Sequence, residues 1–319
     1  MSAVVFDKVG KRYPNAPRAA VDDCSLEVAQ GQFVVLLGPS GCGKTTLLKM
    51  VNRIIEPTSG RIVVDGTDVG SLPATELRRR IGYVIQQVGL FPHMSVEQNI
   101  AVVPRLLHWP KARIAARVDA LLEIVGLPPA DYRARRPREL SGGQQQRVGI
   151  ARAMAADPPT MLMDEPFGAI DAITRTRLQD ELLRIQQQVR KTVLFVTHDV
   201  EEALRLADVL VVMRDGRIVQ AGSPRSILEA PADAFVTELV GAGDALRRLS
   251  LIPVAEIMRR GASDPGSPTV SQDDSLRVAL ALLLGAGART LSVVDESGQT
   301  VGCLDLADLH RVAPGARSA

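Results

Sequence analysis

The chain has 319 residues, of which 46% are hydrophobic and 23% charged, a composition that excludes a disordered, a collagen-like or a disulfide-based protein. Its net charge of +2 is too small for a protein that coats nucleic acid or anionic lipid by charge alone, and ten aromatic residues argue against a base-stacking surface. Three scattered cysteines fit a reduced compartment. The first residues do not read as a secretory signal, and the longest apolar stretch, 278–288, is too short to span a membrane. The length predicts two domains.

The first part of the chain alternates apolar strands with helices. Residues 32–37 form an almost continuous apolar run, typical of a parallel strand that is covered on both faces, and 47–51 are expected to form a helix. Two further runs, 160–163 and 192–196, read as buried strands. Between them, apolar residues at helical spacing over 173–189 indicate an amphipathic helix. Strands that alternate with helices predict an α/β core with a parallel sheet.

The C-terminal third predicts a hairpin and then a smaller unit. Residues 209–222 form two apolar runs joined by Asp215-Gly216, a typical hairpin turn. A short helical stretch then leads to a boundary at 241–243. Beyond the boundary the pattern predicts helices and strands in the order helix 254–259, helix 275–284, strand 291–294, strand 300–304 and helix 306–312.

A glycine-rich loop between the first apolar strand and its helix fits G-x-x-x-x-G-K-[ST]. Gly41 and Gly43 let backbone amides curl round phosphate oxygens at a helix N-terminus. Lys44 would reach the β- and γ-phosphates, and the Thr45 hydroxyl would bind Mg²⁺. The sequence therefore predicts a nucleotide site with Mg²⁺, and the loop alone does not distinguish a kinase, a GTPase and an ATPase. The loop comprises Gly38, Pro39, Ser40, Gly41, Cys42, Gly43, Lys44, Thr45 and Thr46.

Two later motifs predict hydrolysis. An apolar strand ends in Asp164 and Glu165, so we expect Asp164 in the Mg²⁺ shell and Glu165 as the general base for the attacking water. A second anion site is expected at a helix N-terminus formed by Ser141, Gly142, Gly143 and Gln144, because its amides and hydroxyl can meet phosphate. A plain helix cap would not need two glycines.

With these motifs in place, the sequence resembles the ATP-binding subunits of ABC transporters over residues 1 to about 240. The resemblance implies an α/β fold with a RecA-like core and with antiparallel β and helical subdomains. It implies catalytic roles for Lys44, Glu165 and the switch histidine, His198. It also implies that Gln86 contacts the metal, with Gln87 as the alternative. Residues 168–171 match the family's D-loop, in which Asp171 would contact the nucleotide. Tyr13 matches the aromatic residue that stacks on adenine.

In that family two copies sandwich two ATP molecules, with the phosphate loop of one copy facing the signature of the other. By resemblance, Lys44 and Thr45 act on the ATP of their own copy, whereas Ser141 and Gly143 act on that of the second copy. A homodimer is therefore implied.

A narrower resemblance points to the importers of quaternary amines such as glycine betaine, choline, carnitine or proline betaine. It rests on 50–60, 84–94 and 164–171, and it implies a membrane permease, a substrate-binding protein, no nucleic acid and a peripheral place on the cytoplasmic face of the inner membrane. The alternatives are an ABC importer for another small solute and a soluble ABC ATPase acting on DNA or ribosomes. The latter class has two cassettes or an inserted coiled coil, which this chain lacks.

The tail resembles one CBS repeat, a small α+β unit that importers of this class often carry. The implied domains are 1–240 for the nucleotide-binding domain, 241–251 for a linker, 252–313 for the repeat and 314–319 for a tail. Such repeats normally occur as pairs, so we expect the single repeat to expose a face with Val278, Leu282 and Val293 and to pair with a second copy. An unpaired Asp305 and a net charge of −2 over 252–319 disfavour an anionic nucleotide there, which predicts a dimerisation or ionic-strength element.

Overall fold

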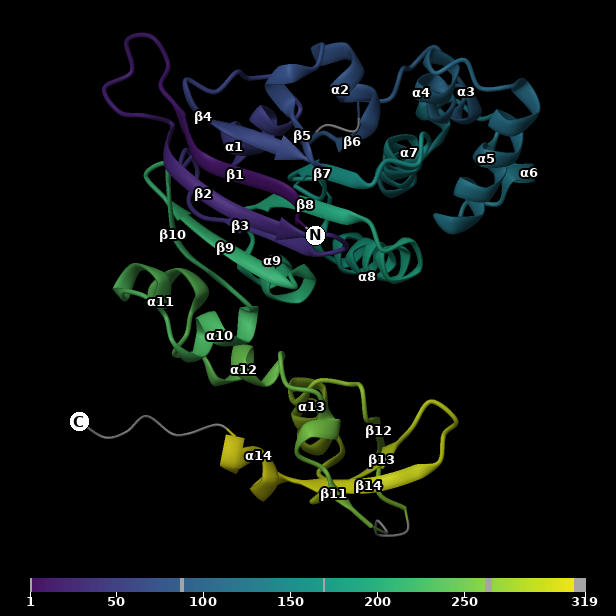
Figure 1. Cartoon of the computed structure of the whole chain (residues 1–319). Helices are drawn as coiled ribbons and strands as arrows, with labels where there is room; N and C mark the ends of the chain where they lie inside the picture. The colour runs from purple at the N-terminus through teal and green to yellow at the C-terminus, as the bar shows by residue number, and fades with distance from the viewer. Residues whose placement is uncertain (1, 87–88, 169, 262–265, 313–319) are drawn as a thin grey trace. The chain divides into compact units, whose positions relative to one another are not determined.

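The computed structural model describes residues 2–86, 89–168, 170–261 and 266–312 (Figure 1). The chain packs as two compact units, Met1–Ser223 and Pro224–Ala319. This division groups residues 224–240 with the C-terminal unit. The domain limits expected at 240 and 252 stay predictions, and the expected tail 314–319 lies outside the described residues.

The first unit begins with an antiparallel sheet in the order β2-β1-β4-β5. Its strands are β1 (Ser2–Lys11), β2 (Val21–Ala29), β4 (Ser59–Val64) and β5 (Thr67–Asp68). Asp65 and Gly66 join the last two strands with positive φ angles of 47° and 77°, which suit the twist of a two-residue hairpin. The antiparallel β part implied by the resemblance is present.

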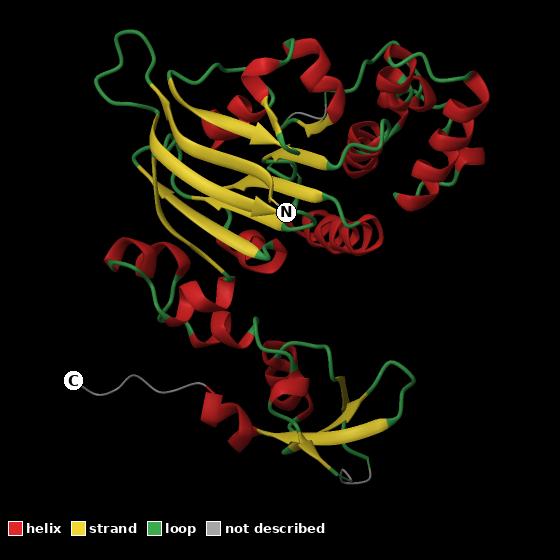
Figure 2. Cartoon of the chain, viewed as in Figure 1, coloured by secondary structure: helices red, strands yellow, loops and turns green. Residues whose placement is uncertain are grey.

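A six-stranded sheet forms the centre of the unit in the order β10-β9-β3-β8-β7-β6 (Figure 2). Its strands are β3 (Phe33–Leu37), β6 (Ile81–Val84), β7 (Thr160–Asp164), β8 (Thr192–Thr197), β9 (Val209–Arg214) and β10 (Arg217–Gly222). All neighbours pair in parallel except β9 with β10. Every residue of β3, β7 and β8 is buried, as their unbroken apolar runs predict. The expected parallel sheet is confirmed.

The predicted hairpin also forms, and its turn lies against the glycine-rich loop. Asp215 and Gly216 have φ angles of 50° and 80°, again the geometry of a two-residue hairpin turn. The amide of Gly216 donates to the carbonyl of Cys42 over 3.0 Å, and its carbonyl accepts from the amide of Asp22 over 2.8 Å. The turn thus fixes part of the loop from outside.

Helices complete the first unit. Helix α1 (Lys44–Val51) buries Leu47 and Leu48 in one core with residues of both sheets, including Phe6 and Leu36. The other helices are α2 (Ala74–Arg80), α3 (Val96–Ile100), α4 (Val102–Leu106), α5 (Lys111–Ile124), α6 (Pro129–Tyr132), α7 (Gly142–Met154), α8 (Ala172–Val189) and α9 (Val200–Leu206), with single 3₁₀ turns η1 (Val69–Ser71) and η2 (Pro137–Glu139). In Figure 1, helices α3 to α7 gather beside the β6 edge of the central sheet.

The second unit has its own small core. It contains α10 (Pro224–Glu229), α11 (Ala234–Val240), α12 (Ala245–Leu249), η3 (Val254–Glu256), β11 (Arg259–Arg260), β12 (Thr269–Ser271), α13 (Leu276–Ala286), β13 (Thr290–Val294), β14 (Thr300–Asp305) and α14 (Leu306–Val312). Four strands pair in the order β11-β14-β13-β12. The predicted helices and strands from residue 275 onward are confirmed within two residues of their expected ends.

One expected helix of this unit is wrong. Residues 254–259 do not form a helix: a single 3₁₀ turn ends at Glu256, because Arg259 and Arg260 pair with Cys303 and Gly302 of β14 instead. The segment 241–251, expected to be a linker, contains helix α12, whose N-terminus is capped by the side chain of Asp244; its role as a linker stays a prediction.

The acidic residues of the tail are not unpaired, which corrects the expectation for Asp305. Its carboxylate forms an ion pair with Arg259, and the same guanidinium lies 3.1 Å from Asp308, which is 3% exposed. The pKa of Asp305 is lowered, mainly by the backbone amide of Asp308, with a further contribution from Arg259. Val293, expected on an exposed face, is fully buried in the core of the unit.

Candidate nucleotide site

The glycine-rich loop follows β3 and opens helix α1, as predicted. Gly41 and Gly43 have φ angles of 81° and 106°, which residues with a Cβ rarely adopt. A Cβ at Gly43 would lie 2.3 Å from the carbonyl oxygen of Ala20. The loop therefore requires glycine at position 43 for two reasons, backbone conformation and space.

Lys44 lies at the first position of α1 and is almost fully buried. Its Nζ donates to the carbonyl oxygens of Gly38 and Pro39 over 2.7 and 3.0 Å, and it lies 3.7 Å from the buried thiol of Cys42. A buried ammonium group needs such partners. The loop therefore surrounds the positive charge of Lys44 with its own backbone, and this charge favours the binding of an anion such as phosphate.

Asp164, at the end of β7, meets Thr45 and two residues that the sequence did not single out. The Thr45 hydroxyl donates to Asp164 Oδ1 over 2.9 Å, and Lys49 Nζ lies 3.5 Å from Oδ2. Tyr83 hydrogen-bonds to the same carboxylate, and burial, together with this carboxylate, raises the pKa of its hydroxyl. The sequence does contain a signal for Lys49, because it lies four residues after Thr45 and therefore on the same face of the helix. Nothing in the sequence pattern relates Tyr83 to Asp164.

Glu165 follows immediately, with a different set of partners. Its φ angle is +44°, an unusual value for a residue other than glycine and one that is concentrated at functional sites. The amide of Glu165 donates to the carbonyl of Val196 in β8 over 3.0 Å. Its Oε2 accepts from Gln86 Nε2 over 3.1 Å and lies 3.2 Å from Nδ1 of His198. Three residues predicted from separate motifs, Gln86, Glu165 and His198, are therefore in contact.

The signature residues form a capped helix start. The Ser141 hydroxyl accepts from the amide of Gln144 over 3.3 Å, and the Gln144 side chain accepts from the amide of Ser141 over 2.9 Å, which is a capping box. Gln144 Nε2 donates to the hydroxyl of Tyr132. These bonds stay within the helical part of the unit, which comprises helices α3 to α7 (96–154). Ser141 and Gly142 are exposed, and a Cβ at Gly142 would meet no atom within 4 Å.

The other predicted residues that the structure describes, Tyr13 and Asp171, have partners close to them in the sequence. Tyr13 is 39% exposed, and Lys11 Nζ lies 5.4 Å from the centre of its ring. Asp171 caps helix α8 by accepting from the amide of Thr174 over 3.0 Å. Gln87, the alternative to Gln86, and Ala169 of the predicted D-loop lie outside the described residues.

Comparison with known proteins decides the family. The family model "ABC transporter" matches residues 21–168, and the model "CBS domain" matches residues 254–315. A glycine betaine/carnitine/choline transport ATP-binding protein of Bacillus subtilis is 47% identical over 302 residues, covering 94% of this chain and 78% of that protein. The chain belongs to the ATP-binding subunits of ABC transporters. The expected family and its CBS tail are confirmed.

Two further similarities agree. The ATP-binding protein of a glycine betaine uptake system in Escherichia coli is 48% identical to this ABC subunit over 307 residues, covering 96% of this chain and 98% of that protein. A solved ATP-binding cassette, described as a dimeric post-hydrolysis state bound to ADP and Pi, has a TM-score of 0.61 and 30% sequence identity, and the match covers 69% of this chain and 98% of the cassette. The expected fold class is confirmed, and the subunit is an ATPase that binds ATP.

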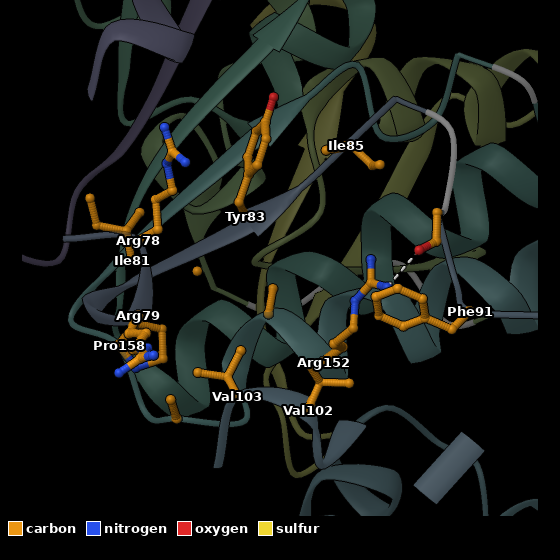
Figure 3. A pocket seen from close by; sticks show the side chains of 14 residues that line it. Arg78, Arg79, Ile81, Tyr83, Ile85, Phe91, Val102, Val103, Arg152 and Pro158 are labelled. Atoms are coloured by element: carbon orange, nitrogen blue, oxygen red, sulfur yellow. Dashed lines mark hydrogen bonds between the residues drawn. The ribbon is translucent and has the colours of Figure 1, made fainter. Parts of the chain in front are cut away.

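A cavity of about 330 Å³ lies beside β6, the edge strand of the central sheet (Figure 3). Tyr83 and Ile85 line it from the strand side, and Phe91, Val103 and Arg152 line it from the helices and the preceding loop. Arg152 donates to the carbonyl of Gly89 over 2.7 Å, and burial lowers the pKa of its guanidinium. In the part of the chain that the structure describes, no helix of this ABC subunit is long and apolar enough to cross a membrane.

Proposed function

We propose that Glu165 is the general base of ATP hydrolysis and that His198 and Gln86 hold it in place. The supporting observation is that both partners contact the same oxygen, Oε2, at 3.1 to 3.2 Å. A carboxylate fixed in this way can accept the proton of a water that attacks the γ-phosphate. The left-handed backbone of Glu165 and the hydrogen bond from its amide to the carbonyl of Val196 in β8 fix the position from which the side chain extends.

Lys44, Thr45 and Asp164 would serve the phosphates and the metal. The hydroxyl and carboxylate oxygens of Thr45 and Asp164 lie 2.9 Å apart and are the ligand types that Mg²⁺ prefers, so these residues fit the ion, with Gln86 as a further contact. When bound, Mg²⁺ neutralises charge that develops on the phosphates. Lys44 contributes the buried positive charge of the loop itself, and the backbone from Gly38 to Thr46, with Ser40, Cys42 and Thr46 among its residues, surrounds the phosphates.

The signature is proposed to act on the nucleotide of a second copy. Its exposed helix start, at Ser141 and Gly142, presents amides and a hydroxyl on the surface, and such a start attracts phosphate. Since the bonds of Ser141 and Gln144 remain within the helical part, the site is completed by pairing. The solved cassette above is itself dimeric. Asp171, at the start of α8, would lie at the same junction.

We also propose that the subunit energises import of a quaternary amine such as glycine betaine, choline, carnitine or proline betaine. The support is that the similarity to relatives of this specificity extends over 94% to 96% of the chain and so includes the tail. The permease would dock at the cavity beside β6, where Phe91 and Val103 offer apolar surface close to Gln86. The subunit would then lie on the cytoplasmic face of the membrane, and a substrate-binding protein would be the further partner.

Transport of labelled solutes tests the substrate. The chain is purified with its native permease and reconstituted in vesicles, and ATP-driven uptake of betaine, choline and carnitine is compared with that of methionine and a sugar. We expect uptake of at least one quaternary amine. Uptake of methionine or the sugar alone would contradict the proposed class.

Replacing Glu165 by Gln tests the base. The variant keeps the size and the hydrogen bonds but loses the proton acceptor, so ATP should bind while turnover falls by about 10²–10⁴, the usual contribution of a general base. Size-exclusion chromatography with ATP should show a stabilised dimer, with the natural chain as the control. Near-normal ATPase activity would remove Glu165 from this role.

A further inference from the structure

We infer that Arg175 is a positioning residue for ATP hydrolysis: it ties the turn before helix α8 to the turn before helix α9 and thereby sets where His198 stands against Glu165. The inference rests on the roles proposed above for those two residues. Arg175 belongs to neither of the motifs that it joins, and the sequence pattern of α8 does not distinguish it from the other arginines of that helix.

The guanidinium of Arg175 bridges two separate chain segments. Nη2 donates to the main-chain carbonyl of Ile170 over 3.0 Å, and Nη1 lies 3.1 Å from Oδ2 of Asp199. Ile170 immediately precedes the cap of α8, and Asp199 immediately follows His198. The two segments follow β7 and β8 respectively, the strands after which Glu165 and His198 stand. One planar side chain therefore joins the two loops that supply the base and its partner.

Asp199 restricts the position of His198, its neighbour in the chain. Its Oδ1 accepts from the amide of Glu202 and caps helix α9 over 3.1 Å, so the second oxygen is the one that meets Arg175. The amide of Asp199 donates to the Thr197 hydroxyl over 3.0 Å. The backbone on either side of His198 is thus fixed, on one side by β8 and on the other by a carboxylate that Arg175 holds.

A second polar contact, deeper in the unit, separates positioning from folding. Gln179, one turn further along α8, donates to Glu202 Oε1 over 3.1 Å, and both side chains are buried. Apolar residues of α8, Leu178 and Leu182, are buried as well. Because these contacts hold α8 in place without Arg175, its loss should move the turn at His198 and leave the packing intact.

The substitution Arg175→Lys tests the bridge. Lysine keeps the positive charge but lacks the planar fork that reaches two acceptors at once. Displacing a catalytic group by about 1 Å costs up to about 100-fold in rate, so we expect kcat of the full-length chain to fall by about 10- to 100-fold. The affinity for ATP and the thermal unfolding midpoint should match those of the control Arg177→Lys, an exposed arginine on the same helix. A kcat within about twofold of the control, or a loss that follows a lowered unfolding midpoint, would overturn the inference.

Combination with His198→Ala shows whether Arg175 acts through the histidine. If it does, adding Arg175→Lys to His198→Ala lowers kcat no further, whereas multiplied losses would show an independent effect and refute the inference. Failure of the proposed function gives a different result, since normal turnover in Glu165→Gln or His198→Ala would remove the proposed roles of those residues.

Discussion

Two adjacent carboxylates at the end of β7 have contrasting surroundings. Asp164 is buried and is contacted by a hydroxyl, an ammonium group and a phenol, from Thr45, Lys49 and Tyr83. Glu165 is more exposed, and its partners are an amide and an imidazole. A carboxylate surrounded by fixed donors suits a structural or metal-binding task, whereas one on the open side of the strand end can meet a reacting water. The left-handed backbone conformation of Glu165 gives these two consecutive side chains different partners.

Tyr13 is the residue expected to stack on adenine. Tyr13 is 39% exposed, so its ring is accessible to a base. If the ring stacks on adenine, Tyr13→Ala should weaken ATP binding by about 1–3 kcal/mol. Tyr13→Phe should stay close to the natural chain because the ring, not the hydroxyl, makes the contact. Isothermal titration with ATP measures both, and equal affinity in the alanine variant would make Tyr13 a packing residue.

Gly41 and Gly43 of the glycine-rich loop differ in what an added side chain would meet. Alanine at either Gly41 or Gly43 must adopt a positive φ angle, which costs about 1–2 kcal/mol. Only at Gly43 does the new Cβ also meet backbone, 2.3 Å from Ala20, whereas nothing lies within 4 Å at Gly41. Gly43→Ala should therefore lower the free energy of unfolding more than Gly41→Ala and should abolish ATP binding. Denaturant unfolding of the two variants side by side measures the difference, and equal losses would contradict the steric argument.

Helix α13 has an exposed apolar face. It has a single charged residue, Arg277, in eleven positions, a composition typical of a helix that is covered on all sides. Yet Val278 and Leu282, four residues apart and so on one face of the helix, are 41% and 36% exposed. We expect this face to meet the same face of a second copy, so Leu282→Asp in the full chain should lower dimerisation without ATP and leave ATP affinity unchanged. Analytical ultracentrifugation compares it with Leu282→Met, and an unaltered association constant would contradict the pairing.

Local patterns in the sequence determine much of this protein. Unbroken apolar runs specify β3, β7 and β8, because a strand that is covered on both faces carries apolar side chains on both of them. The glycine loop, the Asp215-Gly216 turn and the capped start at Ser141 are likewise local, since each depends on the conformations that a few neighbouring residues allow. The glycine loop and the start at Ser141 are also among the motifs that carry the family resemblance.

Tertiary structure alone decided which distant residues meet. Parallel strands place their carboxyl ends at one edge of the sheet, and this brings Gln86, Glu165 and His198 together although they lie far apart in the chain. Long-range pairing also overrode the helical pattern at 254–259, since Arg259 pairs with β14 and with Asp305. The link from Arg175 to Asp199 is of the same kind. Hydrogen-bond partners far away in sequence leave no periodic trace, because periodicity records only which face of an element is buried.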